Sequence, residues 1–508
     1  MHSTLTIKPL MIVMFSITFL VSACEQLDDK TVDAALSPAP NIVVIVADDQ
    51  GYADVSYKNL ADDVNTPNID KLAAIGTDFT QAYVPSPICS TSRTSLITGS
   101  YSQRLGMYWY GGKGLENPEF QTLAEKLKEA NYTTGYIGKY HYGNSKKSID
   151  RNFPLHHGFD YFYGFEGGRK HYLIHNDAKE KAFNKTRNSL KAKGESLTMG
   201  SVWVNHKKVK QNGFSTELIE KQATEFIRNN QSSPFYLQVS FNALHNFTHQ
   251  LPDEYLAKHK LPKRMDWEPN NESFRQWYVA ARAPNNEYGR EYYLGQLYYL
   301  DQAIGEIVNE LEKNNLLENT IIVYLSDNGG STPIYANNGR FRGSKYTLYE
   351  GGIRVPMIVY IPEEFRHNTT MNRRIDDVVS TMDIYPTLLQ AAGLQAPENI
   401  DGESLVELML NNSPMSREAL VWDTGHEIAV RKGRWKYHAV YDDYYAEKQM
   451  VDLELGEFLY DVESDPEESI NLIEQYPDIV VTLKSIHQQW SLRNKHRPSR
   501  EPKKARNL

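Results

Sequence analysis

The side chains best suited to chemistry are two pairs of oxygen donors, Asp48-Asp49 and Asp327-Asn328, and one cysteine, Cys89. Carboxylate and amide oxygens are hard ligands, which suit Ca²⁺ or Mg²⁺ better than a soft transition metal. No Cys/His set with zinc spacing stands near either pair. Each pair alone is also typical of a turn, but both pairs follow apolar runs of strand character. We therefore expect a Ca²⁺-type site formed by the two pairs together.

Cys89 begins the segment CSTSRTSLITG, in which hydroxyl residues precede an apolar turn and Gly99. This pattern predicts a short helix whose first turn holds the cysteine. The N-terminus of a helix attracts anions such as sulfate, and Arg93, one turn on, would add a guanidinium for an oxyanion. Taken alone, Cys89 would be interpreted as a buried, inert thiol.

Buried strands that alternate with helices would position these groups. Four apolar runs predict strands, at residues 41–47, 132–137, 234–241 and 321–325. The polar residues that follow the runs are Asp48-Asp49, Lys139 with His141, His245, and Asp327-Asn328. Residues 297–311 have apolar side chains at helical spacing. The alternation predicts an α/β fold with a large doubly wound mixed sheet flanked by helices, in which ligands gather beyond the carboxyl ends of the strands.

The pattern changes after about residue 410. Short strands with polar turns are expected at residues 419–422, 428–430, 435–440 and 458–462, and a final helix at 479–490. We interpret this part as a smaller α+β domain with a short antiparallel sheet. The expected domains are a catalytic domain at 41–412, a C-terminal subdomain at 413–492 and a basic tail at 493–508.

The N-terminus has the layout of a secretory signal, with Lys8 before an apolar run at residues 10–20 that is too short to span a bilayer. The small residues before Cys24 resemble the lipobox of bacterial lipoproteins, whose signal is cut before an acylated cysteine. This predicts a signal at 1–23, a lipid on Cys24 and a polar tether at 24–40. Glu25 follows the cysteine, so we expect attachment to the outer membrane; an ordinary cleaved signal is the alternative.

The net charge and the number of cysteines limit which ligands and which disulfides are expected. The net charge of -9 over 508 residues argues against nucleic-acid binding. The overall charge would not attract a polyanionic substrate either, so local positive groups would have to bind it. The chain has two cysteines. If Cys24 is acylated, Cys89 has no partner for an intrachain disulfide.

The segment at Cys89 resembles the type I sulfatase signature, Cys-x-Pro/Ala-x-Arg followed by Leu-x-x-Gly. This family belongs to the alkaline-phosphatase superfamily, and the resemblance extends over nearly the whole chain after the tether. Further segments similar to the family's are IVADD with GY at 45–52, GKYHYG at 138–143, GFDYFYG at 158–164, SFNALH at 240–245, SDNG at 326–329, RGSK with EGGIRVP at 342–356, and LYD through DPEE to NL at 459–472.

The resemblance implies the role of residue 89. A formylglycine-generating maturation system would oxidise Cys89, and the hydrated gem-diol of the aldehyde would be the nucleophile. One Ca²⁺ ion would bind residue 89 and the four oxygen donors Asp48, Asp49, Asp327 and Asn328. Thr91 stands where the family has Pro or Ala, within the short segment that the maturation system reads.

The resemblance also implies the remaining catalytic roles. The cations that would offset charge on the transferring sulfuryl group are Arg93, Lys139 and Lys345. Asp327 would take the proton of the attacking hydroxyl, and a covalent sulfate ester would form on residue 89. His245, with Lys345, would protonate the leaving sugar oxygen, and His141 would deprotonate the second hydroxyl to expel sulfate.

The substrate expected for a lipid-anchored enzyme of this family is a sulfated polysaccharide or its oligosaccharides. The candidate sugar contacts are Trp109, Tyr110, Arg169, His171 and His175. Two other functions stay open. One is a phosphate or phosphonate ester hydrolase of the same superfamily, and the other is a glycan-binding lipoprotein on an inactive scaffold.

Overall fold

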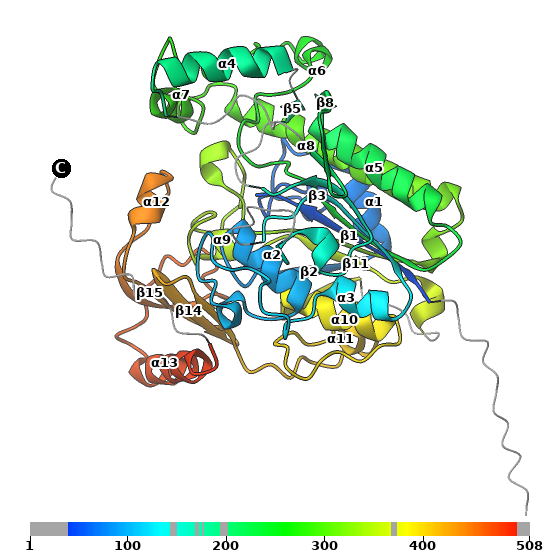
Figure 1. The fold of residues 1–508 in the computed structure, drawn as a ribbon. Coiled ribbons are helices and arrows are strands. Elements are labelled where there is room, and N and C mark those ends of the chain that lie inside the picture. Colours follow the sequence, from blue (N-terminus) through cyan, green and yellow to red (C-terminus); the bar gives the residue numbers. More distant parts are fainter. Residues whose placement is uncertain are drawn as a thin grey trace, which may run out of the picture. The chain divides into compact units, whose positions relative to one another are not determined.

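A ten-stranded mixed sheet organises the computed structural model of this chain (Figure 1). The structure describes residues 39–142, 150–167, 172–174, 177–193, 202–366 and 373–494. In spatial order the strands are β12 (Arg374–Ser380), β2 (Thr77–Tyr83), β11 (Met357–Tyr360), β10 (Thr320–Ser326), β1 (Asn41–Ala47), β9 (Phe235–Ser240), β3 (Thr133–Lys139), β4 (Tyr161–Phe165), β6 (Val202–Val204) and β7 (Lys207–Val209).

The four strands expected from the sequence lie side by side in the middle of this sheet, as β10, β1, β9 and β3, and all run parallel. β1 covers the predicted residues, and all of its side chains are buried. β3 continues past the predicted end to Lys139, because Gly138 and Lys139 still pair with Gly164 and Phe165 of β4. Since parallel strands end at the same edge of a sheet, the polar residues that follow these four strands converge there.

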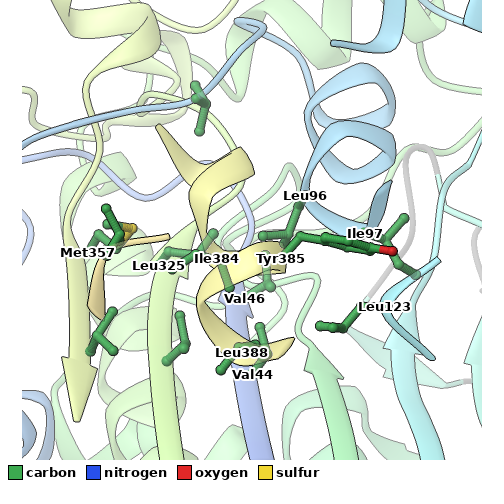
Figure 2. Close-up of a cluster of buried hydrophobic side chains, with 14 of the residues drawn as sticks. Val44, Val46, Leu96, Ile97, Leu123, Leu325, Met357, Ile384, Tyr385 and Leu388 are labelled. Atoms are coloured by element: carbon green, nitrogen blue, oxygen red, sulfur yellow. The ribbon is translucent and has the colours of Figure 1, made fainter. Parts of the chain in front are cut away.

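Helices cover both faces of the sheet. On one face, Val44 and Val46 pack with apolar side chains of helices that include α2 and α10 (Figure 2). On the other face, Val43 and Ile45 pack with α1, α5 and α8. The covering helices are α2 (Cys89–Thr98), α3 (Leu123–Glu129), α10 (Ile384–Ala391) and α11 (Val406–Asn411) on the first face, and α1 (Pro67–Ile75), α5 (Ser215–Asn229) and α8 (Gly289–Lys313) on the second. The doubly wound arrangement is thereby confirmed.

The C-terminal part contains the expected short antiparallel sheet, built from β13 (Leu420–Asp423), β14 (Glu427–Lys432), β15 (Trp435–Val440) and β16 (Gly456–Asp461). Trp490 of the last helix, α13 (Pro477–Ser491), packs in a cluster with Tyr437 and Leu459 of this sheet. The indole of Trp422 donates to the carbonyl oxygen of Val84 at 2.8 Å, which ties the small sheet to the large one. The described residues form one compact unit, and the boundary near residue 412 stays a prediction.

Other strands and α-helices of the described chain are β5 (Leu173–Ile174), α4 (Asp177–Ser189), β8 (Gly213–Phe214), α6 (Asp253–Lys258), α7 (Phe274–Ala280), α9 (Glu350–Ile353) and α12 (Tyr444–Lys448). Within the described ranges, no helix is long and apolar enough to cross a bilayer. The expected signal peptide, Cys24, nearly all of the tether and all but the first residues of the basic tail lie outside those ranges.

Candidate active site

The predicted chemical groups meet at the carboxyl edge of the central strands. Asp48 and Asp49 follow β1 directly, Asp327 follows β10, and Cys89 begins α2. One ligand atom from each of these four residues lies within 4.8 Å of the others. Asn328 joins this cluster through a side-chain contact with Asp49, which lies 279 positions earlier in the sequence.

Cys89 is buried at the first position of α2, and its side chain is 1% exposed. The helix ends, as expected, at Gly99, whose φ of 62° is in the left-handed region that glycine tolerates. Lys345 donates a hydrogen bond from Nζ to Sγ of Cys89 at 3.1 Å. Burial raises the pKa of the Cys89 thiol to about 12, although Lys139 and Lys345 act in the opposite direction. The unmodified side chain is therefore a protonated thiol, which is a weak nucleophile.

Three buried cations surround the acidic cluster. Arg93 donates from Nε to Asp327 Oδ2 at 2.7 Å and from Nη1 to the carbonyl oxygen of Lys139 at 3.0 Å. Lys139 pairs with Asp48, and Lys345 pairs with Asp49 at 2.6 Å. Burial opposes the charge of each lysine, but the neighbouring carboxylates raise both lysine pKa values above the usual range. The three cations stay charged and provide fixed positive groups for an oxyanion.

The acidic cluster has the composition and the free acceptors of a divalent-cation site. Asp48 Oδ1 and Asn328 Oδ1 are both buried, and neither has a hydrogen-bond donor among the described residues. Asn328 donates from Nδ2 to Asp49 Oδ1 at 2.8 Å. A buried acceptor with no donor costs free energy unless a cation satisfies it, and hard oxygen donors suit a cation of the Ca²⁺ or Mg²⁺ class. The residues present thus fit a metal ion.

Two histidines expected from the sequence lie in the wall of the pocket that contains Cys89. His141 follows β3, and its backbone amide donates to the carbonyl oxygen of Glu166 at 2.5 Å. His245 follows β9, and its Nε2 lies 3.9 Å from Asp49 Oδ2. Both histidines, Cys89 and Lys345 line one cavity with a volume of about 500 Å³. The structure therefore brings every predicted catalytic residue to a single edge of the sheet.

A short polar network reaches His245 from α7. The side-chain amide of Asn246 contacts Nδ1 of His245 at 3.2 Å, and Tyr278 donates from its hydroxyl to Asn246 Oδ1 at 2.9 Å. These two partners were not expected from the sequence. They fix the ring of His245 from the side opposite Asp49, as a positioned acid or base requires.

The predicted sugar contacts have different surroundings. Tyr110 lines the cavity. Trp109 is 6% exposed and packs edge-on against Tyr110, with ring centroids 5.5 Å apart. Arg169, His171 and His175 lie outside the described residues. Cavity residues that the sequence did not indicate include Phe274, Arg275, Tyr278, Arg282, Tyr346 and Lys448.

Comparison with protein families decides the identity of this site. Residues 40–394 match the family described as Sulfatase, which is more than half of the chain. The chain belongs to the sulfatase family. Residues 340–495 match the family described as N-sulphoglucosamine sulphohydrolase, C-terminal. This sulfatase is accordingly a hydrolase of sulfuric esters, and the resemblance seen in its motifs is confirmed.

Proteins similar to this sulfatase include one that is named for a sugar and one whose solved structure holds an oligosaccharide. The N-acetylgalactosamine-6-O-sulfatase of Bacteroides thetaiotaomicron is 27% identical over 535 residues, covering 92% of this chain and 96% of that protein. The crystal structure of Ps i-CgsB in complex with k-i-k-neocarrahexaose has a TM-score of 0.72 and 29% identity, covering 91% of this chain and 94% of that one. The phosphonate monoester hydrolase of Agrobacterium radiobacter shares the fold, with a TM-score of 0.57 and 19% identity, covering 89% of this chain and 95% of that one.

Proposed function

We propose that this sulfatase hydrolyses sulfate esters on a sulfated carbohydrate, a polysaccharide or its oligosaccharides, with residue 89 acting as formylglycine. The observation that carries the proposal is the position of Cys89, in the first turn of α2 and 3.1 Å from the ammonium group of Lys345. The carbohydrate is supported by a relative named for N-acetylgalactosamine and by a similar structure that holds neocarrahexaose.

The first half of the reaction transfers the sulfuryl group to residue 89. A formylglycine-generating maturation system first converts the cysteine to an aldehyde, which adds water to give a gem-diol. Asp327 takes the proton from one hydroxyl as its oxygen attacks sulfur. The bond between sulfur and the sugar oxygen breaks, and His245, with Lys345, supplies the proton that the leaving oxygen needs. Arg93 and Lys139 stabilise the negative charge of the sulfuryl oxygens.

The second half releases inorganic sulfate. His141 removes the proton from the remaining hydroxyl of residue 89, and the bond from its carbon to the sulfated oxygen breaks. The carbonyl reforms, sulfate leaves, and water restores the gem-diol. The imidazole of a histidine titrates near neutral pH, so it can accept this proton and return it to solvent.

We propose that the bound metal is one Ca²⁺ ion. Asp48, Asp49, Asp327 and Asn328 would hold it together with residue 89, and the two buried acceptors without donors support this set. When bound, the ion supplies Lewis-acid charge that polarises a sulfate oxygen. Elemental analysis of the purified enzyme tests the identity of the ion, and stoichiometric Mg²⁺ in place of Ca²⁺ would refute this part of the proposal.

Mass spectrometry of the peptide that contains residue 89, from enzyme made in its native host, tests the nucleophile. A mass that corresponds to the aldehyde or its hydrate is expected. An intact thiol in fully active enzyme would refute it. Sulfate release from a panel of sulfated polysaccharides tests the substrate class, and activity on aryl sulfates alone would refute the carbohydrate assignment.

Hydrolysis of phosphate or phosphonate esters is the second candidate, since a phosphonate monoester hydrolase has the same fold. Matched sulfate and phosphate monoesters of one phenol distinguish the two functions. We expect a higher kcat/KM for the sulfate, because the family match is to sulfatases. A clear preference for the phosphate would favour the second candidate.

We also propose that Cys24 carries a lipid that anchors the enzyme to the bacterial outer membrane. The support is the sequence alone, in which an apolar run ends at Val21-Ser22-Ala23-Cys24. Metabolic labelling with a fatty-acid analogue tests this, with Cys24→Ala as the comparison. Equal labelling of both proteins, or recovery of the wild-type enzyme in the soluble periplasmic fraction, would refute the anchor.

A further inference from the structure

Arg282 is a buried cation in the wall of the active-site cavity. Its side chain is 3% exposed, and it lines the same cavity as Cys89 and His245. The guanidinium lies over the ring of Tyr278, 4.7 Å from its centroid. Its Nη1 donates to the backbone and side-chain oxygens of Gln449, both at 3.3 Å. This arrangement fixes the guanidinium between α7 and the segment that follows α12.

The guanidinium of Arg282 has no anionic partner among the described residues. No carboxylate in the described part of the chain forms an ion pair with it, and its buried Nε has no acceptor there. Gln449 uses only Nη1, and Nη2 donates to no described residue, so Nη2 is the donor that remains available to a ligand. A buried charge without a counterion is costly, so this position is suited to an anion that arrives with the substrate.

Two more cations belong to the same wall. Arg275 of α7 and Lys448 of α12 both line the cavity and are exposed, and neither forms an ion pair with a described carboxylate. The described cavity lining contains no Asp or Glu. The remaining lining cation, Lys345, is already paired with Asp49 beside Cys89. The chain as a whole has a net charge of -9, so this cationic wall is a local feature.

We propose that Arg282, with Arg275 and Lys448, binds a second oxyanion of the substrate, either a sulfate ester or a carboxylate on a sugar near the scissile sulfate. This inference rests on the proposed sulfatase function and adds that the preferred substrate carries at least two anionic groups. A guanidinium donates charge-assisted hydrogen bonds to either oxyanion. A cavity of about 500 Å³ is large enough to hold more of the substrate than one sulfate group.

The test compares wild-type enzyme with Arg282→Gln and Arg282→Lys on substrates that differ in their second anion. An aryl sulfate carries only the scissile group, whereas matched oligosaccharides carry one sulfate, two sulfates, or one sulfate and a uronate. Arg282→Gln should lower kcat/KM for the substrates with two anions by about tenfold or more, the value of a charge-assisted hydrogen bond. Its kcat/KM for the aryl sulfate should stay within about twofold. Arg340→Gln, at an exposed arginine outside the cavity, is the matched control.

The two anion sources and the structural alternative give different outcomes. A larger loss on the disulfated substrate identifies a sulfate, and a larger loss on the uronate identifies a carboxylate; either result supports the second-anion site. Equal losses on all substrates with a lower Tm would overturn it, because Arg282 would then serve only to hold Gln449. A wild-type enzyme that releases sulfate from none of the substrates would instead overturn the proposed function itself.

Discussion

The Nζ atom of Lys345 lies 3.1 Å from the Sγ atom of Cys89. The same ammonium group is 2.6 Å from Asp49 Oδ1, so one cation joins the position of the nucleophile to the acidic cluster. Burial opposes this charge, but Asp49 and Cys89 raise the pKa of Lys345 well above its usual value. A charged donor is therefore fixed where a sulfate ester on residue 89 would lie.

Lys345→Met should lower kcat/KM for sulfate esters by about 100-fold or more, because it removes a buried charged donor that stabilises the transferring group. Lys71→Met, at an exposed lysine of α1, should leave kcat/KM unchanged. Steady-state rates on an aryl sulfate measure the effect, and mass spectrometry shows whether residue 89 is still converted. Near wild-type rates in a converted Lys345→Met enzyme would contradict the role of this lysine.

Removal of the metal should lower both activity and stability, because buried Asp48 Oδ1 and Asn328 Oδ1 would lose the cation that satisfies them. A ligand at 100 times its Kd stabilises the folded state by about 2.7 kcal/mol, so Ca²⁺ titrated into stripped enzyme should raise the Tm. Asp48→Asn should reduce the response to Ca²⁺. A Tm independent of Ca²⁺, in active enzyme free of metal, would contradict the site.

The polar residues that follow the four central strands could be predicted from the sequence because those strands are buried on both faces. Such strands are continuous apolar runs, and β1 has the bounds that its run indicates. Asp48, Lys139, His245 and Asp327 end up together because β1, β3, β9 and β10 are parallel neighbours. The spacing of these four residues in the sequence does not show that they are neighbours. Their proximity follows from the rule that sites in α/β sheets form beyond the carboxyl ends of the parallel strands.

The part of the cavity wall that contains Tyr278 and Arg282 could not be predicted in this way. Arg282 and Tyr278 stand in a polar stretch around a short helix, where a lone arginine usually faces solvent. Arg282 is buried against Tyr278 and against Gln449, which lies 167 positions further along the chain. Trp109, expected from the sequence to contact sugar, packs against the rings of Tyr110 and His426, and its contact with a substrate stays a prediction.

Thr91→Ala should lower the free energy of unfolding by about 1 kcal/mol, the usual net value of a hydrogen bond. The Thr91 hydroxyl lies 2.5 Å from Ser86 Oγ and 3.1 Å from the carbonyl oxygen of Ile88 at the start of α2. We expect residue 89 to be converted in this variant, since the family has Ala here. Urea unfolding and mass spectrometry measure the two effects, with Thr91→Ser as the control. An unconverted cysteine in folded Thr91→Ala protein would contradict the expectation.

Part of the acid sensitivity of this sulfatase should come from His157. Burial lowers the pKa of His157 from 6.5 to about 3, and its Nδ1 lies 2.8 Å from the carbonyl oxygen of Arg151. Between these two pH values the unfolded chain binds a proton that the folded chain does not, so stability must fall as the pH falls below 6.5. Above that pH the histidine is neutral in both states, and its contribution is constant.

The measurement is the free energy of unfolding of wild-type and His157→Gln protein between pH 7.5 and pH 5, as a difference at each pH. This difference should change by up to about 1.4 kcal/mol per pH unit below the unfolded-state pKa and be flat above it. Other groups that titrate in this range cancel, because both proteins contain them. A flat difference between pH 7.5 and pH 5 would show that the buried imidazole becomes protonated without cost to the fold.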